Sequence, residues 1–264
     1  MSHDQQPVHL VVNGYIGEVI LNRPKKRNAL NIEAWNLLKD IFEQCAKDSR
    51  VEIVILRGAD LSVFSAGADI SEFETVRANA SLNREYSAVV KSAVMSIKNL
   101  AKPVIAMVSG YCVGGGTELA VACDLRFGSD TLKMGITPAK LGFVYDVEET
   151  KMLVDLVGPS HAKDILFSAR LLDAPEAHHM GLIDRIVPKD MLVATTRNYI
   201  DKLLRNAPQS IRGAKAIING IVAGSPDDPQ LKQIVSDSLD SRHYQEGVKA
   251  FIDKRRPDFL SIPE

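Results

Sequence analysis

Two apolar runs in the first half of the chain constrain the fold more than any other feature of the sequence. Residues 51–56 and 104–108 are short, rich in β-branched side chains and bounded by polar or turn-forming residues. A strand that is apolar on both faces is buried on both faces, as in a parallel sheet covered by helices. Helices are predicted around these runs, over residues 31–47, 82–100 and 117–123. Strands that alternate with helices place the chain in the α/β class.

The N-terminal segment is predicted to begin with a β-hairpin. Apolar runs at 8–12 and 18–21 are separated by residues 13–17, which start with Asn-Gly, a pair typical of tight turns. In the helix predicted over residues 31–47, apolar side chains recur at steps of three and four. Asn31 can cap this helix by accepting hydrogen bonds from the unpaired amides of the first turn.

The C-terminal part of the chain is predicted to be helical throughout. No strand pattern remains after Pro188, and helices are expected over residues 191–205, 210–222 and 229–252. We therefore divide the chain near residue 195. The division gives an α/β core at 1–195 and a helical region at 196–264.

Composition argues against several classes of function. Lys plus Arg number 32 and Asp plus Glu number 33, a formal net charge of −1, whereas a dedicated nucleic-acid-binding domain carries a basic excess. No stretch approaches the roughly 18 apolar residues of a membrane span, and residues 1–10 carry no apolar signal core. Cys45, Cys112 and Cys123 are odd in number and far apart, which favours a reducing compartment, and we expect a cytoplasmic protein. No histidine lies in a metal-binding constellation, so we expect no metal.

Two turns rich in small residues follow the predicted buried strands. Residues 65–70 read Ser-Ala-Gly-Ala-Asp-Ile, and residues 110–116 end in three glycines. Small side chains let the backbone approach a ligand closely, and a helix that starts at the glycines directs free amides toward that ligand. The second turn lacks the Lys-Ser/Thr of a Walker loop and the spacing of a dinucleotide-binding loop. Glu118 lies two residues beyond Gly116, where it can face the same ligand.

These residues closely resemble the signatures of the enoyl-CoA hydratase/isomerase (crotonase) superfamily. One signature corresponds to residues 105–125 with their glycine triplet, and another to the turn at 66–70. Further similarity is found at residues 21–24, 28–30, 246–247, 250–251 and 254–255. The resemblance covers nearly the whole chain.

The resemblance implies a spiral core of repeated ββα units and a C-terminal helical trimerisation region, assembled as a homotrimer or a dimer of trimers. It also implies an acyl-CoA thioester as the substrate, within fatty acid metabolism, and no separate cofactor. The amides of Ala68 and Gly115 correspond to an oxyanion hole for the thioester carbonyl. Enolate charge develops on that oxygen, and preorganised amides stabilise it there more than in the ground state.

The catalytic residues that the resemblance implies depart from the hydratase pattern at one position. Glu118 matches one of the two hydratase glutamates, but the position of the second, twenty residues later, is Pro138. Proline cannot transfer a proton. Asp146 matches an aspartate of dienoyl-CoA isomerases and of an aryl-CoA dehalogenase, and Tyr145 matches a tyrosine of the methylmalonyl-CoA decarboxylase branch, which carries a histidine where this chain has Ala68.

Several reactions therefore stay open at this point. Enoyl-CoA hydration is the leading hypothesis, with Glu118 holding water and Asp146 or solvent handling the second proton. Isomerisation of an enoyl- or dienoyl-CoA needs acids that shuttle a proton, and Glu118 with Asp146 would suffice. Decarboxylation of a malonyl-type thioester needs the oxyanion hole and a donor such as Tyr145. A different kind of hypothesis is that the protein binds acyl-CoA without catalysis. Pro138 motivates it, because a pseudo-enzyme loses its catalytic acids first.

Further residues are expected at the substrate site because of the resemblance. The polar segment 71–81 follows the first turn, and we expect it to be mobile and to gate the acyl pocket. Basic side chains are expected to meet the CoA, a phenylalanine to wall the acyl pocket, and residues of the two turns to line the substrate site; these residues are Lys25, Lys26, Lys254, Phe251, Ala66, Asp69, Ile70 and Gly114.

Overall fold

The computed structural model describes residues 6–262, which fall into two compact units. The first unit comprises Met1–Leu100 and Val104–Thr195, and the second comprises Ala101–Pro103 and Thr196–Glu264. No helix within the described range has the length and apolar character needed to cross a bilayer.

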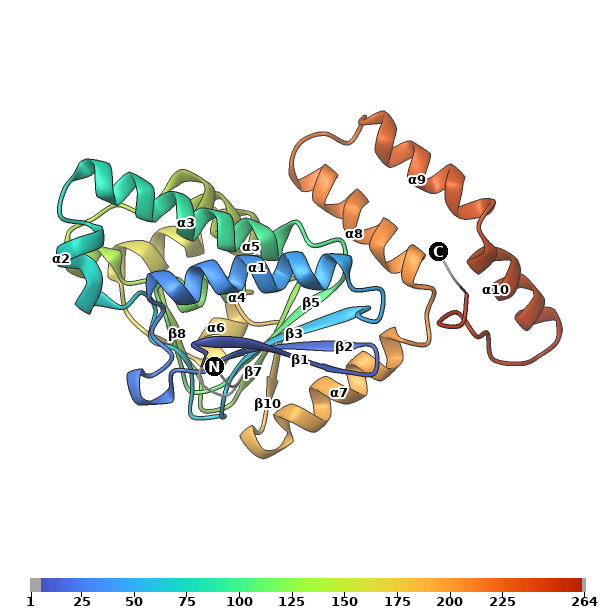
Figure 1. Ribbon diagram of the computed structural model, residues 1–264, viewed down its shortest axis with the longest axis horizontal. Coiled ribbons are helices and arrows are strands. Elements are labelled where there is room, and N and C mark those ends of the chain that lie inside the picture. The colour runs from blue at the N-terminus through green and yellow to red at the C-terminus, as the bar shows by residue number, and fades with distance from the viewer. Residues whose placement is uncertain (1–5, 263–264) are drawn as a thin grey trace. The chain divides into compact units, whose positions relative to one another are not determined.

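The strands of the first unit form two sheets (Figure 1). The six-stranded sheet has the order β1 Val8–Asn13, β2 Ile16–Leu21, β3 Ile53–Gly58, β5 Val104–Val108, β7 Leu125–Ser129 and β10 Arg185–Val187. The four-stranded sheet has the order β4 Val63–Ser65, β6 Tyr111–Val113, β8 Lys133–Gly135 and β9 Leu172–Asp173. Only the pairs β1–β2 and β8–β9 are antiparallel among these strands.

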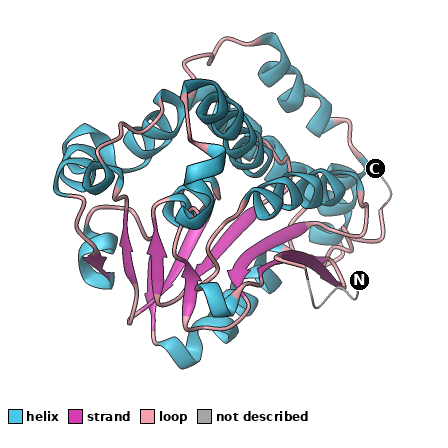
Figure 2. Cartoon of the chain, turned by 60° about the vertical axis from the view of Figure 1, so that its left-hand side comes forward, coloured by secondary structure: helices cyan, strands magenta, loops and turns pink. Residues whose placement is uncertain are grey.

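Helices cover the sheets of the first unit, as the cyan and magenta segments of Figure 2 show. They are α1 Ile32–Lys47, α2 Phe73–Val76, α3 Ala80–Lys98, α4 Gly115–Ala122, α5 Val147–Ser168 and α6 Ala174–His179. Short 3-10 turns are η2 Pro24–Lys26, η3 Ile70–Glu72, η4 Pro138–Leu141 and η5 Lys189–Met191. The axis of α5 is broken at Gly158, which has a φ of +76° and precedes a proline.

The chain repeats one ββα pattern three times, as β3–β4–α3, β5–β6–α4 and β7–β8–α5. In each repeat the first strand joins the six-stranded sheet and the second joins the four-stranded sheet, next to the strand of the previous repeat. This arrangement confirms the predicted spiral of ββα units. It also places the turns that follow β4 and β6 next to each other.

Helix α1 and strand β5 form for the reasons that the sequence indicated. Asn31 caps α1, because its side-chain oxygen accepts a hydrogen bond from the Ala34 amide at 3.1 Å. The apolar face of this helix is buried, with Trp35 and Phe42 among the largest enclosed side chains. Strand β5 has the predicted bounds and is buried along its whole length.

The predicted five-residue loop of the N-terminal hairpin is wrong. Asn13 pairs with Ile16 and Val12 pairs with Gly17, so only Gly14 and Tyr15 form the turn. Gly14 has a φ of +58°, a left-handed conformation that glycine adopts without strain. The next strand is also shifted, since β3 begins at Ile53 rather than at residue 51.

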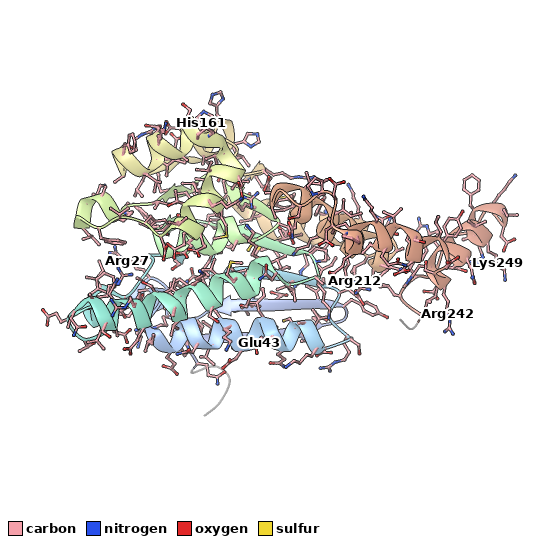
Figure 3. All side chains as sticks on the ribbon, turned by 90° about the horizontal axis from the view of Figure 1, so that it is seen from above. Arg27, Glu43, His161, Arg212, Arg242 and Lys249 are labelled. Carbon is pink, nitrogen blue, oxygen red and sulfur yellow. The ribbon has the colours of Figure 1, made fainter. Side chains whose placement is uncertain are left out.

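The second unit contains the C-terminal helices and most of α7. They are α7 Leu192–Leu203, α8 Pro208–Val222, α9 Pro229–Leu239 and α10 Arg242–Ile252. The predicted single helix over 229–252 is wrong, because Ser241 caps a new helix by accepting from the Tyr244 amide at 3.1 Å. Figure 3 shows Arg242 and Lys249 extending from the last helix.

Candidate active site

A cavity of about 360 Å³ lies within the first unit. Its walls come from the turn after β4, the turn after β6, α2, α3 and the segment that leads into α5. The structure brings together in this cavity most of the residues predicted at the site, namely Ala66, Ala68, Ile70, Gly114, Gly115, Glu118, Tyr145 and Asp146.

The two amides predicted to form an oxyanion hole are neighbours. A methyl group placed on Gly115 would lie 3.6 Å from the Ala68 nitrogen. The adjacent amides are used elsewhere, since Asp69 donates to the Leu30 carbonyl at 2.9 Å and Gly114 donates to a carbonyl of β8 at 2.8 Å. The Ala68 and Gly115 amides have no hydrogen-bond partner among residues 6–262. Both donors therefore remain available to a ligand.

Glycine is required where the two turns pack against each other. Gly67 has a φ of +89°, and a methyl group on it would lie 2.6 Å from the Val113 carbonyl oxygen. A methyl group on Gly116 would lie 2.8 Å from both Cβ and the carbonyl oxygen of Ser65. These contacts leave no room for a side chain, so the small residues bring the two amides close to each other.

Glu118 is a buried acid in the first turn of α4, with 4% of its surface exposed. The hydroxyl of Tyr145 donates a hydrogen bond to its Oε2 at 3.1 Å. Its Oε1 is buried without a donor. The Glu149 side chain, from the first turn of α5, lines the same cavity, and its charge acts on the Glu118 carboxyl.

The surroundings of Glu118 favour its protonated form. Burial raises the pKa of Glu118 well above its usual range, and the charge of Glu149 raises this pKa further. Burial also raises the pKa of Glu149. Burial, followed by the Glu118 charge, holds the pKa of Tyr145 well above its usual value. Burial therefore favours the protonated forms of the Glu118 carboxyl and the Tyr145 phenol.

The sequence predicted that Asp146 both lies at the start of a helix and acts with Glu118. In the structure, Asp146 has the first of these positions and Glu149 has the second. Asp146 is exposed at the cavity and caps α5, with its Oδ1 accepting from the Val147 amide at 2.6 Å. Glu149, one turn further along, lines the cavity with Glu118 and acts on it through its charge. Sequence reasoning missed Glu149, because acids in the first turn of a helix are common for the sake of the helix dipole. The available signal for Glu149 was its place one helical turn after a capping residue that was itself predicted to face the site.

Other predicted substrate residues do not line this cavity. Asp69 holds its own turn, since it accepts from the Ser71 amide at 3.2 Å and pairs with the Arg23 guanidinium at 2.9 Å. Lys25 and Lys26 are exposed in η2, directly before Arg27, which is labelled in Figure 3.

Phe251 and Lys254 belong to the second unit, where Phe251 is 86% exposed. Their predicted contacts with the acyl group and with CoA stay predictions. Within residues 6–262, no group of three or more His, Cys, Asp or Glu side chains has the arrangement of a metal site.

Within residues 6–262, the cavity of this ββα spiral combines two unpaired main-chain amides with one buried acid. A family model described as "Enoyl-CoA hydratase/isomerase" matches residues 12–261. The chain belongs to the enoyl-CoA hydratase/isomerase family. It is a crotonase-family acyl-CoA enzyme.

Relatives and solved structures agree with this assignment. A crotonyl-CoA hydratase of Syntrophomonas wolfei is 32% identical over 245 residues, which is 91% of this chain and 93% of that protein. A short-chain-enoyl-CoA hydratase of Clostridium acetobutylicum is 32% identical over 251 residues, covering 94% and 95% of the two chains. The crystal structure of a putative enoyl-CoA hydratase/isomerase family protein from Hyphomonas neptunium has a TM-score of 0.95 and 36% identity, covering 98% of this chain and 99% of the other.

Proposed function

We propose that this protein is an enoyl-CoA hydratase, in which Glu118 and Glu149 are the two proton-transferring acids. The observation that carries the proposal is the buried Glu118 carboxyl and the half-buried Glu149 carboxyl in the same cavity as two unpaired amides. Hydration of a double bond requires one acid and one base, and the proposal assigns the acid to a protonated Glu118 and the base to an ionised Glu149. The names of the two relatives at 32% identity support the same reaction.

In the proposed mechanism, the thioester carbonyl oxygen accepts hydrogen bonds from the Ala68 and Gly115 amides. Addition of water to C3 of a 2-enoyl thioester moves negative charge onto that oxygen. The amides are fixed by the packing of two turns, so they stabilise the developing charge without reorganising. Their contribution is greatest in the transition state, which is the condition for faster turnover.

The two carboxyls complete the balance of protons. The ionised Glu149 accepts a proton as a water molecule forms its bond to C3. The protonated Glu118 then delivers its proton to C2 of the enolate, which gives the 3-hydroxyacyl thioester. A proton passing from Glu149 to Glu118 restores the starting state. Tyr145 orients Glu118 through its hydrogen bond and stays protonated, because its pKa is raised by burial.

This proposal replaces Asp146 by Glu149 as the second acid of the hydratase mechanism. Asp146 is engaged at the N-terminus of α5 through the Val147 amide. We assign it to holding the start of that helix, and thereby to positioning Glu149. Pro138 occupies the place of the usual second glutamate and lines the same cavity.

The remaining binding roles are also proposals. Lys25, Lys26 and Lys254 are assigned to the phosphates of CoA, and Phe251 to the wall of an acyl pocket. The chain is proposed to form a homotrimer or a dimer of trimers through its C-terminal helices. Exposed apolar side chains at helical spacing on α10 support a contact between copies; they are Tyr244, Val248, Phe251 and Ile252.

Decarboxylation of a malonyl-type thioester is the second candidate. The hydrogen-bonded, protonated hydroxyl of Tyr145 in the cavity favours it, because an enolate left after loss of carbon dioxide needs a proton donor. Isomerisation of an enoyl- or dienoyl-CoA would use the same carboxyls to move a proton between carbons.

The test is turnover of crotonyl-CoA, followed by the loss of its enone absorbance, for the wild type and three variants. We expect hydration by the wild type, its loss in Glu118→Gln and Glu149→Gln, and its retention in Asp146→Asn. Release of carbon dioxide from methylmalonyl-CoA without hydration would favour the second candidate. A shifted double bond in the product would indicate isomerisation, and binding without turnover of any thioester would indicate a non-catalytic binder.

A further inference from the structure

Arg77 lines the same cavity, and the proposed hydration does not use it. It directly follows α2, and its guanidinium carbon lies 4.5 Å from the ring centroid of Phe73, 4.7 Å from that of Tyr86 and 5.0 Å from that of Phe143. These rings also line the cavity and belong to α2, α3 and the segment before α5. Three separate segments therefore hold one cation against the space where a ligand would lie.

The guanidinium lacks an anionic partner. No ion pair joins Arg77 to a carboxylate within residues 6–262, and its Nε is buried without a hydrogen-bond partner. Aromatic faces attract a cation, but they do not satisfy the N–H groups along the edge of a guanidinium. The planar group is suited to binding a carboxylate through two parallel hydrogen bonds. An anion is the ligand that this arrangement fits.

The charge of Arg77 acts on the groups that are proposed to react. Burial raises the pKa of Glu118, Glu149 and Tyr145, and the positive charge of Arg77 opposes this effect on all three. Arg77 also lines one cavity with these three groups, so an anion bound at Arg77 lies near the reacting carbons of the acyl group. The phosphates of CoA are separated from its sulfur by the whole pantetheine arm. The anion accordingly belongs to the acyl group and not to CoA.

We propose that Arg77 binds a carboxylate at the far end of the acyl group, so that the substrates are CoA monothioesters of unsaturated dicarboxylic acids. The substrate class rests on the proposed hydration. A carboxylate that leaves as carbon dioxide loses its charge in the transition state, so a guanidinium bound to it would stabilise the ground state and slow the reaction. Arg77 therefore fits a carboxylate that is retained in the product.

Binding of two saturated thioesters tests the subsite independently of turnover. Glutaryl-CoA and valeryl-CoA have the same number of acyl carbons and differ in a terminal carboxylate against a methyl group. By calorimetry, the wild type should bind glutaryl-CoA about 10- to 100-fold more tightly, the range expected for hydrogen bonds to a charged group. Arg77→Met should abolish this preference and keep the affinity for valeryl-CoA, which also shows that the cavity is intact.

Two further variants control for charge and for general effects of substitution. Arg77→Lys keeps the charge but not the paired hydrogen bonds, so it should retain part of the preference. Arg84→Met removes an exposed arginine of α3 outside the cavity, and it should retain the full preference. Equal wild-type affinities for the two thioesters would overturn the proposal. An equal loss of both affinities in Arg77→Met would overturn it as well, because Arg77 would then contact the CoA part.

Turnover separates this proposal from the function on which it rests. The ratio of kcat/KM for glutaconyl-CoA to that for pent-2-enoyl-CoA should be high in the wild type and should fall about 10- to 100-fold in Arg77→Met. Hydration of both substrates without preference would overturn the subsite and leave the hydratase intact. An Arg77-dependent preference for glutaryl-CoA without any hydration would support the subsite and overturn the hydratase. Arg77-dependent release of carbon dioxide from methylmalonyl-CoA would contradict the retained carboxylate.

Discussion

Proline at position 115 removes one proposed oxyanion-hole donor from a place where a helix tolerates proline. Gly115 is the first residue of α4. Proline is well tolerated there, because the first amide of a helix has no partner within the helix. The loss of one such donor costs about 2.7–4 kcal/mol in the transition state, or about 100- to 1000-fold in kcat. We expect Gly115→Pro to lose at least this much hydratase activity.

Gly115→Ala is the matched control for this substitution. A methyl group on Gly115 would lie 3.0 Å from Cζ2 of the buried Trp35, so both variants crowd the same ring. Such crowding costs about 1–3 kcal/mol of folding stability. Alanine keeps the N–H group, so its kcat should fall by less than about tenfold, which corresponds to about 1.4 kcal/mol in the barrier.

The assay is the initial rate of loss of the enone absorbance of crotonyl-CoA, with the thermal midpoint of each variant measured in parallel. Similar midpoints and a further loss of about 100-fold or more between alanine and proline would support the amide donor. A folded Gly115→Pro variant whose kcat lies within tenfold of that of Gly115→Ala would refute the reasoning.

The remaining predictions concern the acids and the tyrosine. Glu118→Gln and Glu149→Gln should each lower kcat about 100- to 10,000-fold while butyryl-CoA still binds, whereas Asp146→Asn should keep most of the rate, as steady-state kinetics and calorimetry will show. Because the folded-state pKa of Glu118 is raised by burial, the folded chain keeps a proton that the unfolded chain releases above about pH 4.3. Stability should therefore fall as the pH rises, by at most about 1.4 kcal/mol per pH unit, until the folded-state pKa is passed. Glu118→Gln removes this loss, so its thermal midpoint relative to the wild type should increase with pH, and an unchanging difference would contradict the burial effect. Tyr145→Phe removes a hydrogen bond to Glu118, and a pH–rate profile unaltered by it would argue against the orienting role.

Much of the fold follows from local patterns that need no knowledge of distant contacts. Strand β5 is uniformly apolar and is preceded by a proline, so its limits were predicted correctly. The N-terminal hairpin was misjudged because Gly17 has the appearance of a turn residue, although it lies in β2 and pairs with Val12. The break at Ser241 was missed because the apolar spacing on either side continues a helical pattern. The side chain of one serine caps the N-terminus of α10 and so separates it from α9.

The parts of the site that depend on a local backbone motif could be predicted from the sequence. The side chains that meet only when distant elements pack together could not be predicted. The turns that contain Ala68 and Gly115 are local features, and the structure places them side by side. Glu149 and Arg77 gain their surroundings only when α2, α3 and α5 pack around one cavity. The sequence predicts that segment 71–81, which contains Arg77, gates the acyl pocket, and this stays a prediction; the short helices η3 and α2 that form there were not predicted.

A crystal structure with butyryl-CoA, a saturated thioester that cannot be hydrated, would examine the two amides themselves. We predict that the thioester carbonyl oxygen will lie about 2.7–3.1 Å from the nitrogens of both Ala68 and Gly115, with C3 of the acyl chain facing the Glu118 and Glu149 carboxyls. A carbonyl oxygen bonded to neither amide, or to one alone with the other turned away, would contradict the mechanism.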